Sequence, residues 1–418
     1  MDGKQIVVIG GGPAGMMAAL TARRQGAQVL LLDRNRTLGR KLRITGKGRC
    51  NVANDCPADE VLRNIPRNSR FLYSALSQFS PEDVKAFFEQ LGVPLKTERG
   101  NRIFPVSGRA HDVADALASA LRRENVSLRT GRVAAILCRE GAVSGVKLDN
   151  GERLPAQAVI LATGGLSYPA TGSTGDGYRL ARAAGHTVVT PKPSLVPLEA
   201  EPCCAALQGL SLRNVAIRVK NQDGKCLYHD FGELLFTHFG LSGPLILSAS
   251  AHMRDFQHER YRIEIDLKPA LDDKTLDARL LRDFRQNNNR SFQNSLQGLL
   301  PRLLIPEVVR RSGIPPETRI HDITRQQRHS LLRVLKCFSV AVTGPRPVRD
   351  AIVTSGGIAV SEVNPTTMAS KRLPGLYFAG EVLDVDGYTG GFNLQIAWST
   401  GYVAGCWAAW DPVPGGEE

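Results

Sequence analysis

The 418-residue sequence lacks several common signatures. Its eight cysteines contain no C-x-x-C pair, which excludes a zinc ribbon and a thioredoxin-like dithiol, so we expect reduced thiols and no metal site. The start has no basic, apolar and small-residue leader, because a β-branched run begins at Gln5. We therefore expect a cytoplasmic protein.

No stretch has the composition of a lipid-facing helix. Residues 6–22 and 387–410 carry no charge, and the second stretch is long enough to cross a bilayer. Both contain several glycines, and the second also holds Asn393 and Gln395, which are poor choices for lipid. We expect both stretches to be buried in protein, without a membrane partner.

Acidic residues are few relative to basic ones. The chain has 53 Lys or Arg and 40 Asp or Glu, a formal net charge of +13. Residues 274–336 hold thirteen Lys or Arg and only five Asp or Glu. Such an imbalance favours binding of phosphates, and of RNA in particular, although a solvated helical face has a similar composition.

The pattern along the chain predicts an α/β protein with an insertion. Residues 5–33 read as strand, glycine turn, helix and strand, and apolar strands at 158–162 and 375–379 also run into glycine turns. We predict a discontinuous nucleotide-binding domain at 1–190 and 342–418, an inserted β-rich domain at 191–270 and a basic helical subdomain at 271–341. Residues 412–418 read as a disordered tail.

The first glycine turn has the spacing of a dinucleotide-binding fingerprint. Gly10, Gly12 and Gly15 permit, in order, a tight turn, the approach of a pyrophosphate and close helix packing, and the following helix start supplies amides. Asp33 ends the next strand, where its carboxylate can accept hydrogen bonds from a ribose diol. This fingerprint does not separate NAD from FAD.

The C-terminal segment favours FAD. Gly380 and Glu381 follow a strand, and a glycine-rich turn with Asp386 and Gly391 precedes an uncharged helix. A helix N-terminus beneath the flavin N1 and C2 carbonyl would stabilise the negative charge of the reduced ring. No second fingerprint provides a separate nicotinamide domain.

Several motifs together resemble one known family. They are residues 10–15, 39–41, 46–51, 162–165, 354–357, 367–371 and 378–401. The sequence thereby resembles the BaiN/RdsA family of bacterial NAD(P)/FAD-dependent oxidoreductases. The resemblance implies a Rossmann-like, glutathione-reductase-type FAD domain with an inserted β-barrel-like domain and a helical subdomain. It also implies NAD(P)H as reductant, and substrates that range from 23S ribosomal RNA uridine to bile acids and amines.

Residues 34–54 contain seven basic residues and no acidic one, and the resemblance implies that 48–51 line the flavin. Fingerprint, C-terminal segment and resemblance together predict an FAD site. It comprises Gly10, Gly12, Pro13, Ala14, Gly15, Asp33, Arg34, Arg40, Lys41, Arg49, Cys50, Asn51, Val133, Thr163, Gly164, Gly165, Gly380, Glu381, Asp386, Gly391, Asn393, Leu394 and Gln395.

Reduction of a conjugated double bond needs a proton donor beside the flavin. Cys50 and Tyr388 are our predicted catalytic residues, with Asp386 and His238 as alternative acids. The cations near Cys50 would lower the pKa of its thiol, which weakens the case for Cys50 as an acid and slightly favours packing as a small residue beside the ring. His238 stands in apolar company that is typical of a packed histidine.

These patterns predict an FAD-dependent oxidoreductase that reduces a uridine of 23S ribosomal RNA to dihydrouridine with NAD(P)H. Two alternatives stay open. One is a small-molecule flavoenzyme, either an amine oxidase or a reductase of a conjugated double bond. The other is a flavin-containing RNA-binding or redox-sensing protein without catalysis. The oligomeric state is not predicted.

Overall fold

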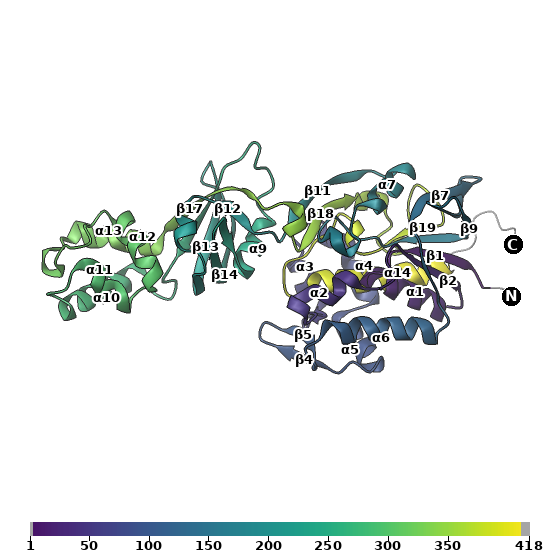
Figure 1. The fold of residues 1–418 in the computed structure, drawn as a ribbon, viewed down its shortest axis with the longest axis horizontal. Coiled ribbons are helices and arrows are strands. Elements are labelled where there is room, and N and C mark those ends of the chain that lie inside the picture. The colour runs from purple at the N-terminus through teal and green to yellow at the C-terminus, as the bar shows by residue number, and fades with distance from the viewer. Residues whose placement is uncertain (1–2, 411–418) are drawn as a thin grey trace. The chain divides into compact units, whose positions relative to one another are not determined.

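The computed structural model describes residues 3–410, so the predicted tail at 412–418 lies outside the described residues. The chain divides into two compact units (Figure 1). Unit 1 comprises the residues up to Ser194 and those from Pro347 on, and unit 2 comprises Leu195–Arg346. The first unit is therefore discontinuous in sequence.

A parallel five-stranded sheet forms the centre of unit 1. Its order is β19 (Leu376–Phe378), β10 (Ala158–Leu161), β1 (Gln5–Ile9), β2 (Gln28–Asp33) and β6 (Ser127–Thr130). The strands expected at 5–9, 158–162 and 375–379 all belong to it. Their unbroken apolar runs are buried, as in other parallel sheets. The predicted Rossmann-like α/β fold is confirmed.

Helices α1 (Pro13–Arg24) and α14 (Phe392–Trp410) pack closely against each other. A Cβ added at Gly401 would lie 2.5 Å from the carbonyl oxygen of Ala14, and one at Gly405 would lie 2.5 Å from that of Ala18. Glycine is required at both positions because the two backbones nearly touch. α14 carries no charge because most of its residues are buried in unit 1. No helix among residues 3–410 is long and apolar enough to cross a membrane.

Smaller elements surround this sheet. The helices are α2 (Arg40–Gly48), α3 (Ala58–Arg63), α4 (Tyr73–Gln78), α5 (Pro81–Gln90), α6 (Ala110–Arg123) and α7 (Asp176–Ala183). One further sheet has the order β3 (Ala53–Asn54), β5 (Arg102–Pro105) and β4 (Leu95–Glu98). A second has the order β7 (Val133–Arg139), β8 (Ala142–Leu148) and β9 (Arg153–Pro155). A third pairs β11 (Val188–Ser194) with β18 (Val353–Ile358).

Unit 2 is a closed barrel with a helical part. The barrel order is β12 (Leu198–Ala200), β15 (Gly240–Ser242), β14 (Cys226–Thr237), β13 (Ser211–Asn221), β16 (Tyr261–Asp266) and β17 (Phe338–Pro345). Its helices are α8 (Cys203–Ala206), α9 (Pro244–Ser250), α10 (Asp273–Gln286), α11 (Phe292–Ser295), α12 (Ile305–Ser312) and α13 (Arg325–Lys336). The predicted barrel-like insertion and helical part are both present.

The boundaries within unit 2 differ from those expected. The barrel is not confined to 191–270, because its last strand, β17, follows the helices and crosses the expected boundary at 341/342. The helical part is thus inserted between β16 and β17. β17 begins two residues after α13 ends, with no proline or glycine between them, so the sequence gives little signal of the change.

The α1–α14 contact yields a stability prediction. Gly401→Ala should lower the free energy of unfolding by about 1–3 kcal/mol, because the new methyl group overlaps the Ala14 carbonyl. Gly131→Ala is the control, since its Cβ would meet only Leu148 methyl groups at ordinary contact distance. Urea unfolding of the full-length protein measures the free energy of unfolding of each variant. Equal stability of the two variants would contradict the close contact between the α1 and α14 backbones.

Candidate cofactor and active site

The glycines of the turn between β1 and α1 differ in the space around them: two face neighbouring backbone, and one faces open space. Gly10 has a φ of +110°, and a Cβ there would lie 2.4 Å from the Ala162 carbonyl oxygen; one at Gly15 would lie 1.8 Å from that of Gly10. Gly12 has no atom within 4 Å of the position of an added Cβ. The start of α1 therefore presents open backbone, which fits the pyrophosphate of FAD.

Asp33 fixes this turn from the end of β2. Its Oδ2 accepts a hydrogen bond of 2.6 Å from the Gly11 amide, and its Oδ1 accepts one of 2.7 Å from the Asn35 amide. The guanidinium groups of Arg34 and Arg40 are directed to Thr174 and Asn35, respectively. Asp33 is half-buried, and both oxygens of its carboxylate are held by backbone amides.

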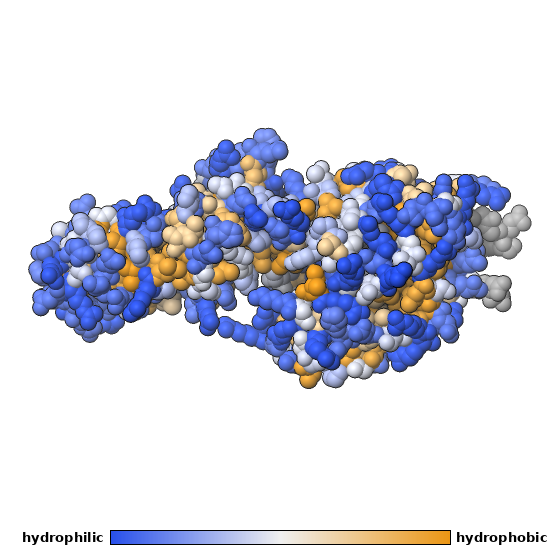
Figure 2. Space-filling view, in the orientation of Figure 1, coloured by the Kyte–Doolittle hydropathy of each residue, from blue (hydrophilic) through white to orange (hydrophobic). Residues whose placement is uncertain are grey.

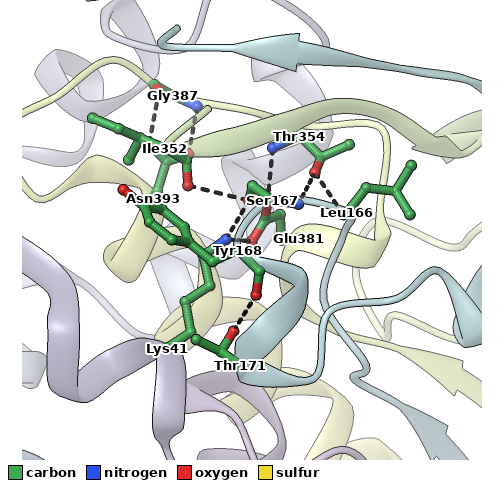
Figure 3. Close-up of polar contacts among 10 residues, drawn as sticks. All are labelled: Lys41, Leu166, Ser167, Tyr168, Thr171, Ile352, Thr354, Glu381, Gly387 and Asn393. Atoms are coloured by element: carbon green, nitrogen blue, oxygen red, sulfur yellow. Dashed lines mark hydrogen bonds and ion pairs between the residues drawn. The ribbon is translucent and has the colours of Figure 1, made fainter. Parts of the chain in front are cut away.

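A polar cluster links α2 with the segment after β19 (Figure 3). Lys41 Nζ donates to Ser167 Oγ at 2.6 Å and forms an ion pair of 2.7 Å with Glu381 Oε2. Glu381 Oε1 accepts from the Thr354 amide at 2.8 Å and from Ser167 Oγ at 3.0 Å. Lys41 and Glu381 each keep 20% of their side chain exposed, so a ligand can reach the pair.

Sequence reasoning placed Lys41 and Glu381 in the site but missed Ser167 and Thr354 as their partners. Lys41 and Ser167 are 126 residues apart, a separation at which no local pattern reports a contact. Tyr168, the next residue, has a φ of +52°, is 36% exposed, and its ring centroid lies 5.9 Å from Lys41 Nζ. These residues bring the loop after β10 into the candidate site.

The predicted cofactor residues fall into two sets by burial. The exposed or half-buried residues are Gly10, Gly12, Pro13, Asp33, Arg34, Arg40, Lys41, Arg49, Asn51, Thr163, Gly164, Glu381, Gly391, Asn393 and Leu394. Buried in the protein are Ala14, Gly15, Cys50, Val133, Gly165, Gly380, Asp386 and Gln395.

The side chains of Asp386 and Gln395, both in the buried set, form hydrogen bonds with protein groups. Asp386 is 1% exposed, and its Oδ2 accepts a hydrogen bond of 2.6 Å from Ser194 Oγ. Gln395 is fully buried, and its Nε2 donates to the Phe79 carbonyl and to Ser399 Oγ. Through Asp386 Oδ2 and Gln395 Nε2, both side chains hold protein elements together.

Arg49 is engaged with protein groups as well. Its Nη2 forms an ion pair of 2.5 Å with Glu98 Oε1, and its guanidinium lies 4.2 Å from the centre of the Phe104 ring. The hydrogen bond from Arg49 holds the pKa of the Glu98 carboxyl below its ordinary value. Asn51 and Arg49 are half-buried at the end of α2, next to Cys50.

The expectation for the Cys50 thiol was wrong in sign. Burial raises the pKa of Cys50 to about 12, whereas its cationic neighbours in sequence were expected to lower it. Cys50 has no exposed surface, so desolvation dominates and the thiol stays protonated. Because protein atoms enclose it, the structure gives no support to Cys50 as a proton donor to a substrate.

The other candidate acids lie in different units. Tyr388 is half-buried in the loop before α14, and Asn393 holds that loop through hydrogen bonds with Gly387 N, Gly387 O and the Tyr388 carbonyl oxygen. His238 belongs to unit 2 and is exposed, with its ring centroid 5.0 Å from that of Phe239. The expectation that His238 is packed was therefore wrong, because this histidine lies beyond the end of β14.

A family model described as HI0933-like protein Rossmann domain matches residues 4–407. The chain belongs to this family. It is 34% identical over 416 residues to the 3-dehydro-bile acid delta(4,6)-reductase of Clostridium scindens, covering 98% of this chain and 100% of that protein. It is 31% identical over 405 residues to the ribosomal RNA dihydrouridine synthase of Escherichia coli, covering 96% and 97%.

The HI0933-like match and these relatives confirm the predicted membership of the BaiN/RdsA family. Among solved structures, 3-ketosteroid delta1-dehydrogenase from Sterolibacterium denitrificans matches with a TM-score of 0.53 at 13% identity, covering 98% of this chain and 100% of that chain. That likeness concerns the fold. The protein is thus a member of an FAD-dependent oxidoreductase family.

The open surface at Gly12 yields a prediction for FAD binding. Gly12→Ala should leave the stability of the protein without FAD within about 1 kcal/mol of wild type, because its Cβ meets nothing. The same methyl group should weaken FAD binding at least about tenfold, since it stands where the pyrophosphate approaches. Fluorescence titration with FAD measures the affinity.

Gly15→Ala is the contrasting variant. Its Cβ would overlap the Gly10 carbonyl, so the loss should be in folding, by more than about 1 kcal/mol. A Gly12→Ala protein that binds FAD as tightly as wild type would exclude the start of α1 as the pyrophosphate site.

Proposed function

We propose that this protein reduces a uridine of 23S ribosomal RNA to dihydrouridine, with FAD as cofactor and NAD(P)H as reductant. The observation that carries the proposal is the whole-length similarity to the Escherichia coli ribosomal RNA dihydrouridine synthase, which covers 96% of the chain. The charge distribution supports it, because the formal net charge is +13 and residues 274–336 are strongly basic.

In the proposed reaction, the protein would bind and orient the cofactor that transfers hydride. FAD, when bound, supplies hydride chemistry towards a carbon–carbon double bond conjugated to a carbonyl group, such as that of uracil. The open backbone at Gly12 would hold its pyrophosphate, and the Lys41–Glu381 pair would hold its ribityl or ribose hydroxyl groups. The N-terminus of α14 would provide amides and positive potential for the flavin.

Tyr388 is the proposed proton donor. Its phenol O–H is suited to deliver a proton to uracil C5 while C6 receives hydride, and bulk water would restore that proton. The Asn393 hydrogen bonds fix the Tyr388 loop directly before α14, and the residue is reachable from solvent. Cys50 has the protonated state that an acid needs, but it lacks the exposure.

A second candidate function has an observation of its own. The bile acid reductase of Clostridium scindens is 34% identical over the entire length of that protein. A conjugated ketone of a steroid acid presents the same chemical problem as uracil, because hydride adds at one carbon of the double bond and a proton at its neighbour. The same residues would serve either substrate.

The RNA reaction can be tested in cells. Deletion of the gene should remove dihydrouridine from 23S ribosomal RNA, as measured by mass spectrometry of its nucleosides. A plasmid with the wild-type gene should restore the nucleoside, and one with the FAD-defective Gly12→Ala gene should not. Unchanged dihydrouridine after deletion would contradict the proposal. NAD(P)H consumption by the purified protein with a conjugated 3-oxo bile acid would then support the second candidate.

Tyr388→Phe and Cys50→Ala separate the two candidate acids. Loss of the phenol should slow substrate reduction by about 10²–10⁴ while NAD(P)H still reduces the bound FAD at the wild-type rate. Cys50→Ala should keep substrate reduction within about threefold of wild type, because the enclosed thiol does not reach a ligand. Stopped-flow absorbance follows the two half-reactions separately. The reverse ranking of the two variants would restore Cys50 as the acid.

A further inference from the structure

Unit 2 carries two adjoining hollows on its surface. One, of about 580 Å³, lies along the outer face of β13, β16 and β17, and includes Tyr261, Arg262 and Glu264. The other, of about 1140 Å³, lies where the same strands meet the start of α10 and the end of α13. We call the two hollows together the basic groove. Its cations are Arg218, Lys220, Arg260, Arg262, Lys274, Arg311, Arg333 and Lys336.

The two hollows form one surface. In the antiparallel register of β13 and β16, Lys220 is opposite Arg262, and Arg218 is opposite Glu264. Arg218, which lines the larger hollow, forms an ion pair of 3.4 Å with Glu264, which lines the smaller one. Cys337 is an exposed cysteine of the larger hollow, and Arg218, Lys220, Arg262 and Glu264 lie close enough to influence the pKa of its thiol, which burial raises. Cys337 therefore marks the junction between the barrel face and the helical end of the groove.

The groove has more cations than its own carboxylates neutralise. Glu264 pairs with Arg218 at 3.4 Å and Lys220 at 3.0 Å, and Asp266 pairs with Lys336 at 2.6 Å. The remaining acids of the lining are Glu259, Asp272 and Asp273. Within residues 3–410, the exposed side chains of Arg260, Arg262, Lys274 and Arg333 form no ion pair.

We infer that the basic groove binds the sugar–phosphate backbone of an RNA strand. This inference rests on the proposed RNA substrate and extends it, because it assigns the contact to named residues of unit 2. Arg262 and Arg333 present planar guanidinium groups that match phosphate oxygens, and Lys274 adds a flexible charge. The half-buried ring of Phe256 in the same lining can stack on an unpaired base.

The helical part of unit 2 favours a polyanion, because residues 274–336 hold thirteen Lys or Arg and five Asp or Glu. Figure 2 shows mostly hydrophilic residues over the α10–α13 part of unit 2 on the face that it presents. Extraction of a base from folded RNA costs free energy, and phosphate contacts away from the reacting base can offset this cost. The groove supplies such contacts without sequence preference.

The test compares two triple variants of the full-length, FAD-loaded protein. The groove variant is Arg262→Gln, Lys274→Gln and Arg333→Gln. The control is Arg122→Gln, Arg123→Gln and Arg153→Gln, which removes the same charge from exposed positions of unit 1. Filter binding of protein-free 23S ribosomal RNA is measured over a salt series, and FAD content reports folding.

The groove variant should bind the RNA at least about tenfold more weakly, and the slope of log affinity against log salt should fall by about 2, since each lost phosphate contact removes about 0.7. The control should retain the wild-type slope. Bound RNA should also slow alkylation of Cys337 by N-ethylmaleimide, but not that of the exposed Cys138 in unit 1.

Two failures can be told apart. If wild-type protein binds the RNA with a steep salt dependence and the groove variant binds equally well, the groove is excluded and the proposed function stands. The groove is likewise excluded, and the proposed function again stands, if bound RNA leaves Cys337 as reactive as before. If wild-type protein shows no salt-dependent binding and deletion of the gene leaves dihydrouridine unchanged, the groove and the RNA substrate are both excluded.

Discussion

The site of unit 1 depends on a set of contacts between peptide backbones. Gly10 and Gly15 bring the first turn of α1 against the end of β10, and Gly401 and Gly405 bring α14 against the same helix. A single methyl group in any of these four places would overlap a carbonyl oxygen. Helices α1 and α14 are thereby fixed against each other, and of Gly10, Gly11, Gly12 and Gly15 in the first turn, Gly12 alone has open space at the position of an added Cβ.

Burial also determines which side chains of unit 1 a ligand could contact. Asp386, Gln395 and Cys50 are enclosed and are bound to or packed against protein groups. Lys41 and Glu381 remain reachable, although each is already oriented by neighbours. The fold thus positions a small number of accessible polar groups on a rigid frame, which is the condition for binding a cofactor with little reorganisation.

The sequence was informative where the signals are local. The glycine spacing of 10–15 and the apolar runs of β1, β10 and β19 predicted the sheet and the cofactor class, because each pattern has one simple structural meaning. The hydrogen bond between Lys41 and Ser167 and the closure of the barrel by β17 depend on distant segments. The pKa of Cys50 depends on burial, which counting nearby cations does not reveal.

The central claim is that unit 1 holds one FAD between the start of α1 and the start of α14. The most direct measurement is the cofactor content of purified protein, released by denaturation and quantified by chromatography after incubation with FAD. The account predicts one FAD per chain. A protein that remains colourless and releases no FAD after this incubation would contradict it.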